Sequence, residues 1–223
     1  MLRWMSGRQV DAAEARAAMV ATQLRARGIT DERVLGAMAT VPRELFVDEH
    51  QRNYAYSDEA LPIESGQTIS QPYVVARMTE LLASRPGDRM LEIGTGSGYQ
   101  AAVLATLGCR VTSIERHPGL ADQARERLTR AGLGEGVEIR VGDGTRGVPD
   151  GAPWDGIVVT AAAPAVPTSL REQLADGARL VIPVGSRTRQ ELLVVTRHGN
   201  EWTEHPDGGV IFVPLIGDEG FDG

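Results

Sequence analysis

The sequence predicts an α/β fold with a doubly wound, Rossmann-like sheet. Three observations predict it. A short apolar strand at residues 90–93 leads into a glycine-rich turn, strands and helices alternate beyond that turn, and Glu115 closes the next strand-like run. Strand, turn, helix, strand and acidic residue therefore follow one another in the order that a site for a nucleotide-containing cofactor requires. A chain of 223 residues can bury a real core, so we expect one domain over residues 1–223.

The glycine-rich turn is Gly94-Thr95-Gly96-Ser97-Gly98, called the glycine turn below. Three alternating glycines let the chain turn sharply and bring backbone N–H groups, with the N-terminus of a following helix, close to a ligand. Glu115 lies about 20 residues beyond Gly94, where an acidic side chain accepts hydrogen bonds from ribose hydroxyls. The pattern predicts a cofactor that packs against bare backbone.

Two details distinguish between candidate cofactors. The third glycine arrives one residue earlier than in the Gly-x-Gly-x-x-Gly pattern of dehydrogenases. Glu92 also places a carboxylate at the strand end, which suits a cationic part of a ligand better than a pyrophosphate. These details favour S-adenosylmethionine. A dinucleotide and a purely structural turn are the alternatives.

The segments before the glycine turn are predicted to be a cap and a loop. Residues 1–52 are expected to form an N-terminal helical cap, since apolar residues repeat at helical spacing before Gly28 and a second helix fits residues 30–41. The repeating residues of the first helix are Val10, Ala13, Ala17, Val20 and Leu24. Residues 53–72 are expected to form a substrate and active-site loop, and Pro72 to open a helix that runs to about Ser84.

Residues 73–223 are expected to form the cofactor-binding α/β core. Helices near 99–107 and 118–131 alternate with strands near 111–114, 137–141 and 156–160. A further strand near 179–184 precedes two β-rich runs, 191–197 and 209–215, joined by a polar turn without a helix. Strands joined by a short turn pair antiparallel. The sequence therefore predicts a mixed sheet with antiparallel C-terminal strands.

Composition excludes several kinds of partner. The net charge of -7 argues against a nucleic-acid-binding surface. The first residues lack the apolar core of a signal peptide, and the longest apolar stretch, near 157–166, is too short to span a membrane. The single cysteine, Cys109, allows no intramolecular disulfide. We expect a cytoplasmic monomer with no nucleic-acid or membrane partner.

Residue usage also excludes several kinds of chemistry. All 23 basic residues are arginine, which rules out a lysine Schiff base and a P-loop lysine. The four histidines lack metal-ligand spacing, and Cys109 has no partner thiol for a zinc site. No metal ligand is predicted.

Several motifs outside the glycine turn are similar to those of one family over nearly the whole chain. The matching segments are Val41-Pro42-Arg43-Glu44-Leu45-Phe46-Val47, Ala60-Leu61-Pro62-Ile63, Gly66-Gln67-Thr68-Ile69-Ser70-Gln71-Pro72, Gly142-Asp143-Gly144, Val159-Thr160-Ala161-Ala162-Ala163-Pro164 and Val213-Pro214-Leu215. With them, the chain resembles the protein-L-isoaspartate (D-aspartate) O-methyltransferases, which methylate isoaspartyl carboxylates in damaged proteins. The glycine turn is shared with many methyltransferases, whereas the segments at 60–63 and 67–72 are specific to this family.

The resemblance implies a role for each motif. Ser70 is implied to be the catalytic hydroxyl and Glu115 to hold the ribose of S-adenosylmethionine, whose product is S-adenosylhomocysteine. Asp143 and Gly144 are implied to lie against the adenine. The methionine part is implied to be surrounded by Glu92, Gly94, Thr95, Gly96, Ser97 and Gly98. The backbone of an isoaspartyl peptide is implied to be held by Ala60, Leu61, Pro62, Ile63, Val213, Pro214 and Leu215.

The chemistry of methyl transfer suits these residues. A carboxylate is already ionised near pH 7, so it attacks a sulfonium methyl group without a general base. A serine at position 70 can orient that carboxylate, although a helix N-cap is an alternative role for Ser70. Three other functions stay open. They are an aspartyl O-methyltransferase that matures one precursor peptide to an aspartimide, an RNA or small-molecule methyltransferase, and a noncatalytic cofactor-binding protein.

Overall fold

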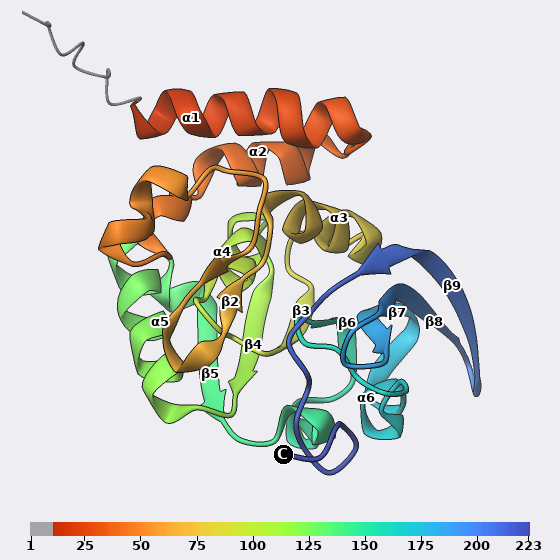
Figure 1. Cartoon of the computed structure of the whole chain (residues 1–223). Coiled ribbons are helices and arrows are strands. Elements are labelled where there is room, and N and C mark those ends of the chain that lie inside the picture. The colour runs from red at the N-terminus through yellow and green to blue at the C-terminus, as the bar shows by residue number, and fades with distance from the viewer. Residues whose placement is uncertain (1–10) are drawn as a thin grey trace, which may run out of the picture.

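The chain folds around a mixed seven-stranded sheet (Figure 1). The computed structural model describes residues 11–223. The strand order is β5-β4-β3-β6-β7-β8-β9, parallel from β5 to β7 and antiparallel from β7 to β9. The strands are β3 (Arg89–Ile93), β4 (Arg110–Glu115), β5 (Val137–Val141), β6 (Trp154–Val159), β7 (Leu174–Gly185), β8 (Gln190–His198) and β9 (Glu201–Val210). The predicted α/β fold with antiparallel C-terminal strands is confirmed.

Alternation along the central strands produces two buried layers, one on each face of the sheet. Met90 and Val158 belong to the core that includes Met78 and Leu104 of the covering helices, whereas Leu91 and Ile157 belong to the core on the other face. Every one of these four strand residues is fully buried. Runs of apolar residues are therefore required in β3 and β6, because both faces of these strands are covered. The helices of the α/β core are α3 (Pro72–Leu82), α4 (Tyr99–Thr106), α5 (Pro118–Arg130) and α6 (Thr168–Glu172).

The topology places a crevice at one end of the sheet. From β3 the chain winds outward through β4 to β5, then returns to β6 on the opposite side of β3. In sheets of this kind, ligands bind outside the carboxyl ends of the strands, at the point where the winding reverses. The glycine turn follows β3 at this point, which fixes where the site must lie.

The N-terminal cap is helical, but only part of its predicted apolar stripe is buried. Helix α1 (Ala12–Ala18) continues as a π-helical turn (Met19–Leu24) and a 3-10 turn, and Gly28 ends it with φ +94°. Met19 and Leu24 are fully buried, whereas Ala13 and Ala17 are exposed. The i to i+5 bonding of the π-helical turn rotates the buried face. The predicted stripe is therefore buried only at its end, where Leu24 lies in the core and Val20 packs against it. Val10 lies outside the described residues.

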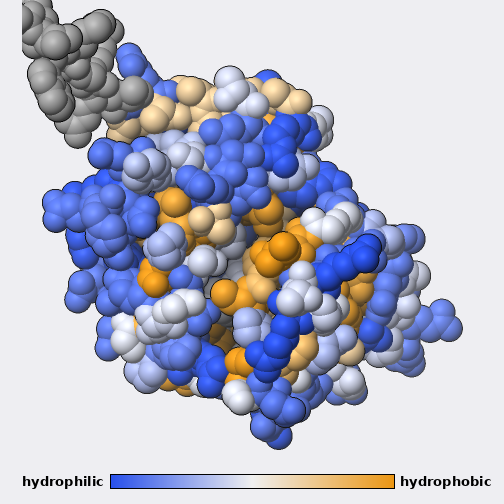
Figure 2. Space-filling view, in the orientation of Figure 1, coloured by the Kyte–Doolittle hydropathy of each residue, from blue (hydrophilic) through white to orange (hydrophobic). Residues whose placement is uncertain are grey.

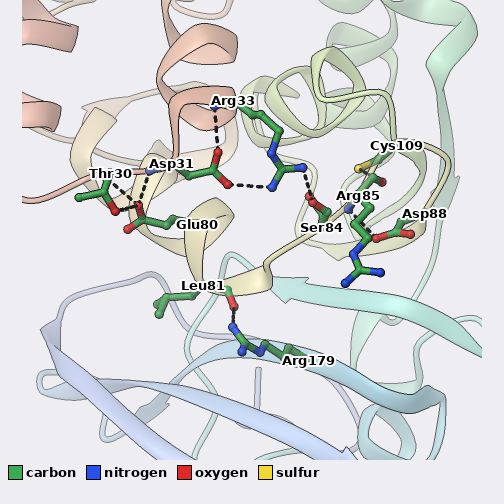
Figure 3. A network of polar contacts seen from close by, with 10 residues as sticks. All are labelled: Thr30, Asp31, Arg33, Glu80, Leu81, Ser84, Arg85, Asp88, Cys109 and Arg179. Atoms are coloured by element: carbon green, nitrogen blue, oxygen red, sulfur yellow. Dashed lines mark hydrogen bonds and ion pairs between the residues drawn. The ribbon is translucent and has the colours of Figure 1, made fainter.

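The cap is tied to α3 by a polar network (Figure 3). Helix α2 (Glu32–Thr40) has Asp31 as its N-cap. The backbone N–H groups of Thr30 and Asp31 donate to Glu80 Oε1 at 2.7 and 2.9 Å. The Arg33 guanidinium donates to the carbonyl oxygen of Ser84 at 2.8 Å. From β7 of the sheet, Arg179 donates to the carbonyl oxygen of Leu81, near the C-terminal end of α3. The C-terminal half of α3 is therefore held between the cap and the sheet.

The segment predicted as a loop at residues 53–72 contains a small hairpin. Strands β1 (Leu61–Pro62) and β2 (Thr68–Ile69) pair antiparallel, and Ile63 N–H donates to the carbonyl oxygen of Gln67 at 2.9 Å. We call residues 61–69 the β1–β2 hairpin. Strands of two residues produce no periodic pattern, which is why the sequence did not indicate them.

The last strand lies earlier than predicted. Strand β9 spans Glu201–Val210, not 209–215, and carries charged residues, Pro206 and two glycines on an exposed edge. The apolar residues 211–215 leave the sheet instead. Ala162 N–H donates to the carbonyl oxygen of Val213 at 2.8 Å, and Leu215 N–H donates to that of Ala162 at 2.7 Å. The apolar run is extended as predicted, but it pairs with the segment that follows β6.

Candidate active site

A cavity opens at the carboxyl ends of β3, β4 and β6. Its lining comes from the glycine turn, the ends of these strands, the β1–β2 hairpin with Ser70, and residues 213–216. Figure 2 shows hydrophobic residues gathered around a hollow in the middle of this face of the molecule. The open space between these segments is about 910 Å³, which includes solvent at its mouth. We call it the first cavity.

The glycine turn is fixed from both sides by neighbouring strands. Gly94 has φ +93°, and its N–H donates to the carbonyl oxygen of Ile114 at 2.8 Å. A Cβ atom on Gly94 would lie 2.6 Å from Thr160 Oγ1, which itself donates to the carbonyl oxygen of Gly94 at 2.5 Å. Glycine is therefore required here by conformation and by space. Thr160 lines the first cavity; from sequence it was part of a family motif at the end of a predicted strand, without a predicted role.

The rest of the turn divides between the cavity and the core. Thr95, Gly96 and Ser97 line the first cavity, and Thr95 Oγ1 lies 2.6 Å from the hydroxyl of Ser113. Gly98 lies behind the cavity instead. Its φ is +89°, and a Cβ there would lie 3.4 Å from Ala124 on α5. Gly98 thus allows α5 to pack closely against the start of α4.

Glu92 has an unsatisfied oxygen in the wall of the first cavity. Its side chain is 0% exposed; Oε2 accepts a hydrogen bond from Ser113, whereas Oε1 has no partner among the described residues. Burial raises the pKa of Glu92 to about 8. A buried carboxyl oxygen without a donor is costly, and a cationic ligand group that donates to it would relieve that cost. This free acceptor oxygen therefore fits the ammonium group of S-adenosylmethionine.

Glu115 closes the opposite side of the glycine turn. Oε2 accepts a hydrogen bond from Gly96 N–H at 2.9 Å, and Oε1 accepts one from His117 N–H at 3.0 Å. The side chain is 5% exposed and lines the first cavity. An ionised carboxylate has about four acceptor sites, so two remain after these bonds. Glu115 is therefore held in place and can still accept from two hydroxyl groups.

Asp143 and Gly144 are placed differently from each other. Gly144 lines the first cavity, where a Cβ atom would lie 2.4 Å from Ile93 Cγ2. Asp143 is not part of the lining. Oδ1 of Asp143 accepts from Thr145 N–H at 2.9 Å, and Oδ2 accepts from Asp218 N–H at 2.9 Å. In this structure its carboxylate caps the 3-10 turn that follows β5 and holds the C-terminal segment.

Ser70 lies between the β1–β2 hairpin and α3, and it lines both the first cavity and a neighbouring second cavity. Helix α3 is capped at Gln71 without a side-chain hydrogen bond, so Ser70 is not its N-cap. No hydrogen bond of the Ser70 hydroxyl to another described residue is present. The hydroxyl is thus left for a ligand at the junction of the two cavities.

Arg43 fixes the backbone of Ser70 from within the core. The Arg43 side chain is 0% exposed; Nη2 donates to the carbonyl oxygen of Ser70 at 2.8 Å, and Nε donates to that of Ala55 at 2.7 Å. Its guanidinium lies 4.8 Å from the centre of the Tyr99 ring. Burial lowers the pKa of Arg43 to about 10. Arg43 was part of a family motif but had no predicted role, and an arginine within an apolar segment is the signal that could have indicated one.

The residues expected to hold a peptide backbone do not lie together. Val213, Pro214 and Leu215 line the first cavity, whereas Ala60 lines the second. The side chains of Leu61 and Ile63 are buried in the core, and Pro62 is exposed. None of these last three residues lines the first or second cavity.

Fold and site together define an S-adenosylmethionine-dependent methyltransferase, because the winding reverses at a glycine turn flanked by Glu92 and Glu115. A model of the protein-L-isoaspartate(D-aspartate) O-methyltransferase family matches residues 15–220. A protein-L-isoaspartate O-methyltransferase of Methanoculleus marisnigri is 57% identical over 205 residues, which are 92% of this chain and 93% of that one. The chain belongs to the protein-L-isoaspartate(D-aspartate) O-methyltransferase family.

Solved structures agree with this assignment. A protein-L-isoaspartate O-methyltransferase with 30% identity superposes with a TM-score of 0.83, covering 92% of this chain and 67% of that chain. A Plasmodium falciparum structure, described as such an enzyme in complex with S-adenosyl-L-homocysteine, has 25% identity and a TM-score of 0.77 and covers 90% of this chain and 98% of that one. The predicted family, enzyme class, activity and cofactor are confirmed. Across residues 11–223, no helix has the length and apolar character needed to cross a membrane.

Proposed function

We propose that this chain transfers a methyl group from S-adenosylmethionine to the free carboxylate of L-isoaspartyl residues in many damaged proteins and peptides. The observation that carries the proposal is the position of Ser70, which lines both the first cavity and the second cavity. A group at this junction can touch both a cofactor and a peptide. The protein is proposed to act as a cytoplasmic monomer built from one domain.

Each wall of the first cavity has a proposed task toward the cofactor. Glu92 receives the ammonium group through its unsatisfied oxygen, and the glycine turn surrounds the methionine part. Glu115 accepts from the ribose hydroxyls. Gly144 provides a flat wall for the adenine, and Asp143 contributes at its edge only if its bonds to Thr145 and Asp218 rearrange.

The residues around Ser70 position and enclose the reacting carboxylate. S-adenosylmethionine, when bound, supplies a methyl group on a positively charged sulfur. The substrate carboxylate is ionised near pH 7, so the chain needs no general base. The Ser70 hydroxyl donates to one carboxylate oxygen and directs the other toward the methyl group. The β1–β2 hairpin and residues 213–216 exclude water, which favours a reaction in which opposite charges cancel.

The product methyl ester then reacts further without the enzyme. The neighbouring backbone nitrogen attacks the ester carbonyl, methanol leaves, and a succinimide forms. Water opens the succinimide to aspartate or isoaspartate. An enzyme that starts this sequence in many proteins must recognise main-chain atoms, because the side chains near the damage differ. The residues Val213–Leu215 are extended, pair with Ala162 and line the first cavity, so they suit such recognition.

The experiment is methyl transfer to a panel of short peptides. Each sequence is made with isoaspartate and with normal aspartate, and radiolabelled S-adenosylmethionine is the donor. The expected result is transfer to isoaspartyl peptides of unrelated sequence and little transfer to their aspartyl partners, since the extra backbone methylene places only one of the two acids in line. Transfer to aspartate in one precursor sequence alone would replace general repair by peptide maturation.

A further inference from the structure

The second cavity adjoins the proposed methyl-transfer site and has an apolar wall. Thr68 and Ser70 line both cavities, so the two spaces are continuous across the end of the β1–β2 hairpin. The segment 209–216 runs along both as well, with residues 209–212 in the second cavity and 213–216 in the first. A peptide lying between the hairpin and this segment would pass from one cavity to the other.

The apolar wall includes a side chain that the fold leaves in solvent. Ile211 is 81% exposed, more than the other large exposed hydrophobic residues described, Tyr54 at 55% and Val141 at 48%. It lines the second cavity together with Val74, Val210 and Phe212. A single exposed isoleucine is ordinary on a protein surface. An isoleucine at the mouth of an apolar cavity that meets the reactive serine offers contact area to a ligand.

The wall is held rigidly from behind. Gln190 is 3% exposed; its Oε1 accepts from Phe212 N–H at 2.9 Å, and its Nε2 donates to the carbonyl oxygen of Ser186 at 2.5 Å. Gln190 also pairs with Val210 across β8 and β9. These bonds fix the backbone of the wall before a ligand arrives, so binding does not have to order it.

We propose that the second cavity binds the apolar side chain of a substrate residue that flanks the isoaspartyl residue, with Ile211 as its main contact. The inference rests on the proposed function and adds a side-chain preference to main-chain recognition. The occupant is apolar because Val74, Val210, Ile211 and Phe212 provide the wall, and it belongs to the substrate because the cavity continues into the methyl-transfer site at Ser70.

The test compares isoaspartyl peptides that differ in one flanking residue. Leucine replaces glycine at each of the two positions on either side of the isoaspartyl residue, and kcat/KM is measured for each peptide. At one of these positions leucine is expected to raise kcat/KM about tenfold, mainly through KM, which is the lower end of the gain from burying a leucine side chain. Ile211→Ser is expected to reduce this preference to about twofold, because the leucine side chain loses its main contact.

Control variants and outcomes separate this inference from the function beneath it. Val141→Ser removes an exposed apolar side chain that lines neither cavity, and it should keep the tenfold preference. Equal kcat/KM for every flanking residue, or a preference that survives Ile211→Ser, overturns the inference alone. Methylation of no isoaspartyl peptide by the unaltered chain overturns the proposed function as well. A change in oligomeric state with Ile211→Ser, without a change in preference, assigns the wall to contact with a second copy and also overturns the inference.

Discussion

The two sides of the active site are built in different ways. The cofactor side is built mainly from one stretch of chain, from Glu92 through the glycine turn to His117, in which Gly94 N–H donates to Ile114 on β4 and Glu115 accepts from Gly96 N–H and His117 N–H. The peptide side is assembled from the β1–β2 hairpin, Ser70 and residues 209–216, which are far apart in sequence. The cofactor side therefore depends on local backbone geometry, and the peptide side depends on contacts that reach across the fold.

A substitution of Arg43 should impair the peptide side of the active site without impairing the cofactor side. Arg43→Met leaves the carbonyl oxygens of Ala55 and Ser70 without their donor. Because an unsatisfied buried carbonyl costs about 1–3 kcal/mol, we expect the free energy of unfolding to fall by roughly 3 kcal/mol. Methyl transfer should fall with it, whereas the affinity of the remaining folded protein for S-adenosylhomocysteine should change only a few-fold. Denaturant unfolding and calorimetry measure the two quantities.

Arg33→Met provides the matched control for this variant. Arg33, in the network of Figure 3, also donates to a carbonyl oxygen, that of Ser84, but it is exposed and lines neither cavity. Its loss should cost about 1 kcal/mol or less and leave turnover unchanged. If Arg43→Met lost S-adenosylhomocysteine affinity as strongly as turnover, the two sides would not be separable as described.

Ser70→Ala tests the junction of the two sides at the level of chemistry. Removing a group that orients the reacting atoms lowers kcat by about 100-fold in comparable sites, and we expect a loss of that order here. Affinity for S-adenosylhomocysteine should stay within a few-fold, because the lost contact belongs to the reacting carboxylate. Ser65→Ala, an exposed serine in the same hairpin, is the control. Full turnover by Ser70→Ala would remove the catalytic role.

The difference between the two sides also explains what the sequence could predict. The glycine turn and Glu115 were found because their spacing is short and each residue has one physical reason to be there. The antiparallel end of the sheet was found from the missing helix. Strand β9 and the hairpin were not, since the first is a polar exposed edge and the second has strands of two residues. Neither produces a hydrophobic period.

Side-chain direction was the other limit. Asp143 was placed correctly after β5, yet its carboxylate accepts from Thr145, two residues on, and from Asp218, which local spacing does not connect to it. Leu61 and Ile63 lie in a family motif, but their side chains complete the core. Arg43 was in a quoted motif without a role. Such partners become visible only when distant segments are brought together.

Glu115→Ala should weaken the cofactor side and leave the peptide side intact. The carboxylate holds Gly96 N–H and His117 N–H and is proposed to accept from the ribose. We expect S-adenosylhomocysteine binding to weaken by about 1.5–3 kcal/mol, the range for hydrogen bonds to a charged group. Calorimetry measures it. Glu115→Gln keeps one acceptor oxygen and should lose less. Unchanged affinity in Glu115→Ala, or tight binding of NADH, would contradict the assignment of this side.

Glu92→Gln is expected to give the smallest effect, a change in how stability and cofactor affinity depend on pH. Burial raises the pKa of Glu92 to about 8 in the folded chain, against an ordinary value of 4.5. Between these values the folded state keeps a proton that the unfolded state releases, so the unliganded chain loses stability as pH rises toward 8. Glutamine carries no such penalty. The Tm of Glu92→Gln should therefore exceed that of the unaltered chain by several degrees at pH 9, and the gap should shrink toward pH 5.

Cofactor binding should show the opposite trend, because a cationic ammonium group stabilises the ionised carboxylate. Binding then releases the proton, so affinity of the unaltered chain for S-adenosylhomocysteine should rise by up to about tenfold from pH 6.5 to 8. With Glu92→Gln the affinity should be lower at pH 8 and nearly independent of pH over this range. Calorimetry at several pH values, in buffers of different ionisation enthalpy, measures both the affinity and the released proton. Parallel pH profiles for the two proteins would show that the ammonium group does not lie against Glu92, and the peptide-side predictions would be unaffected.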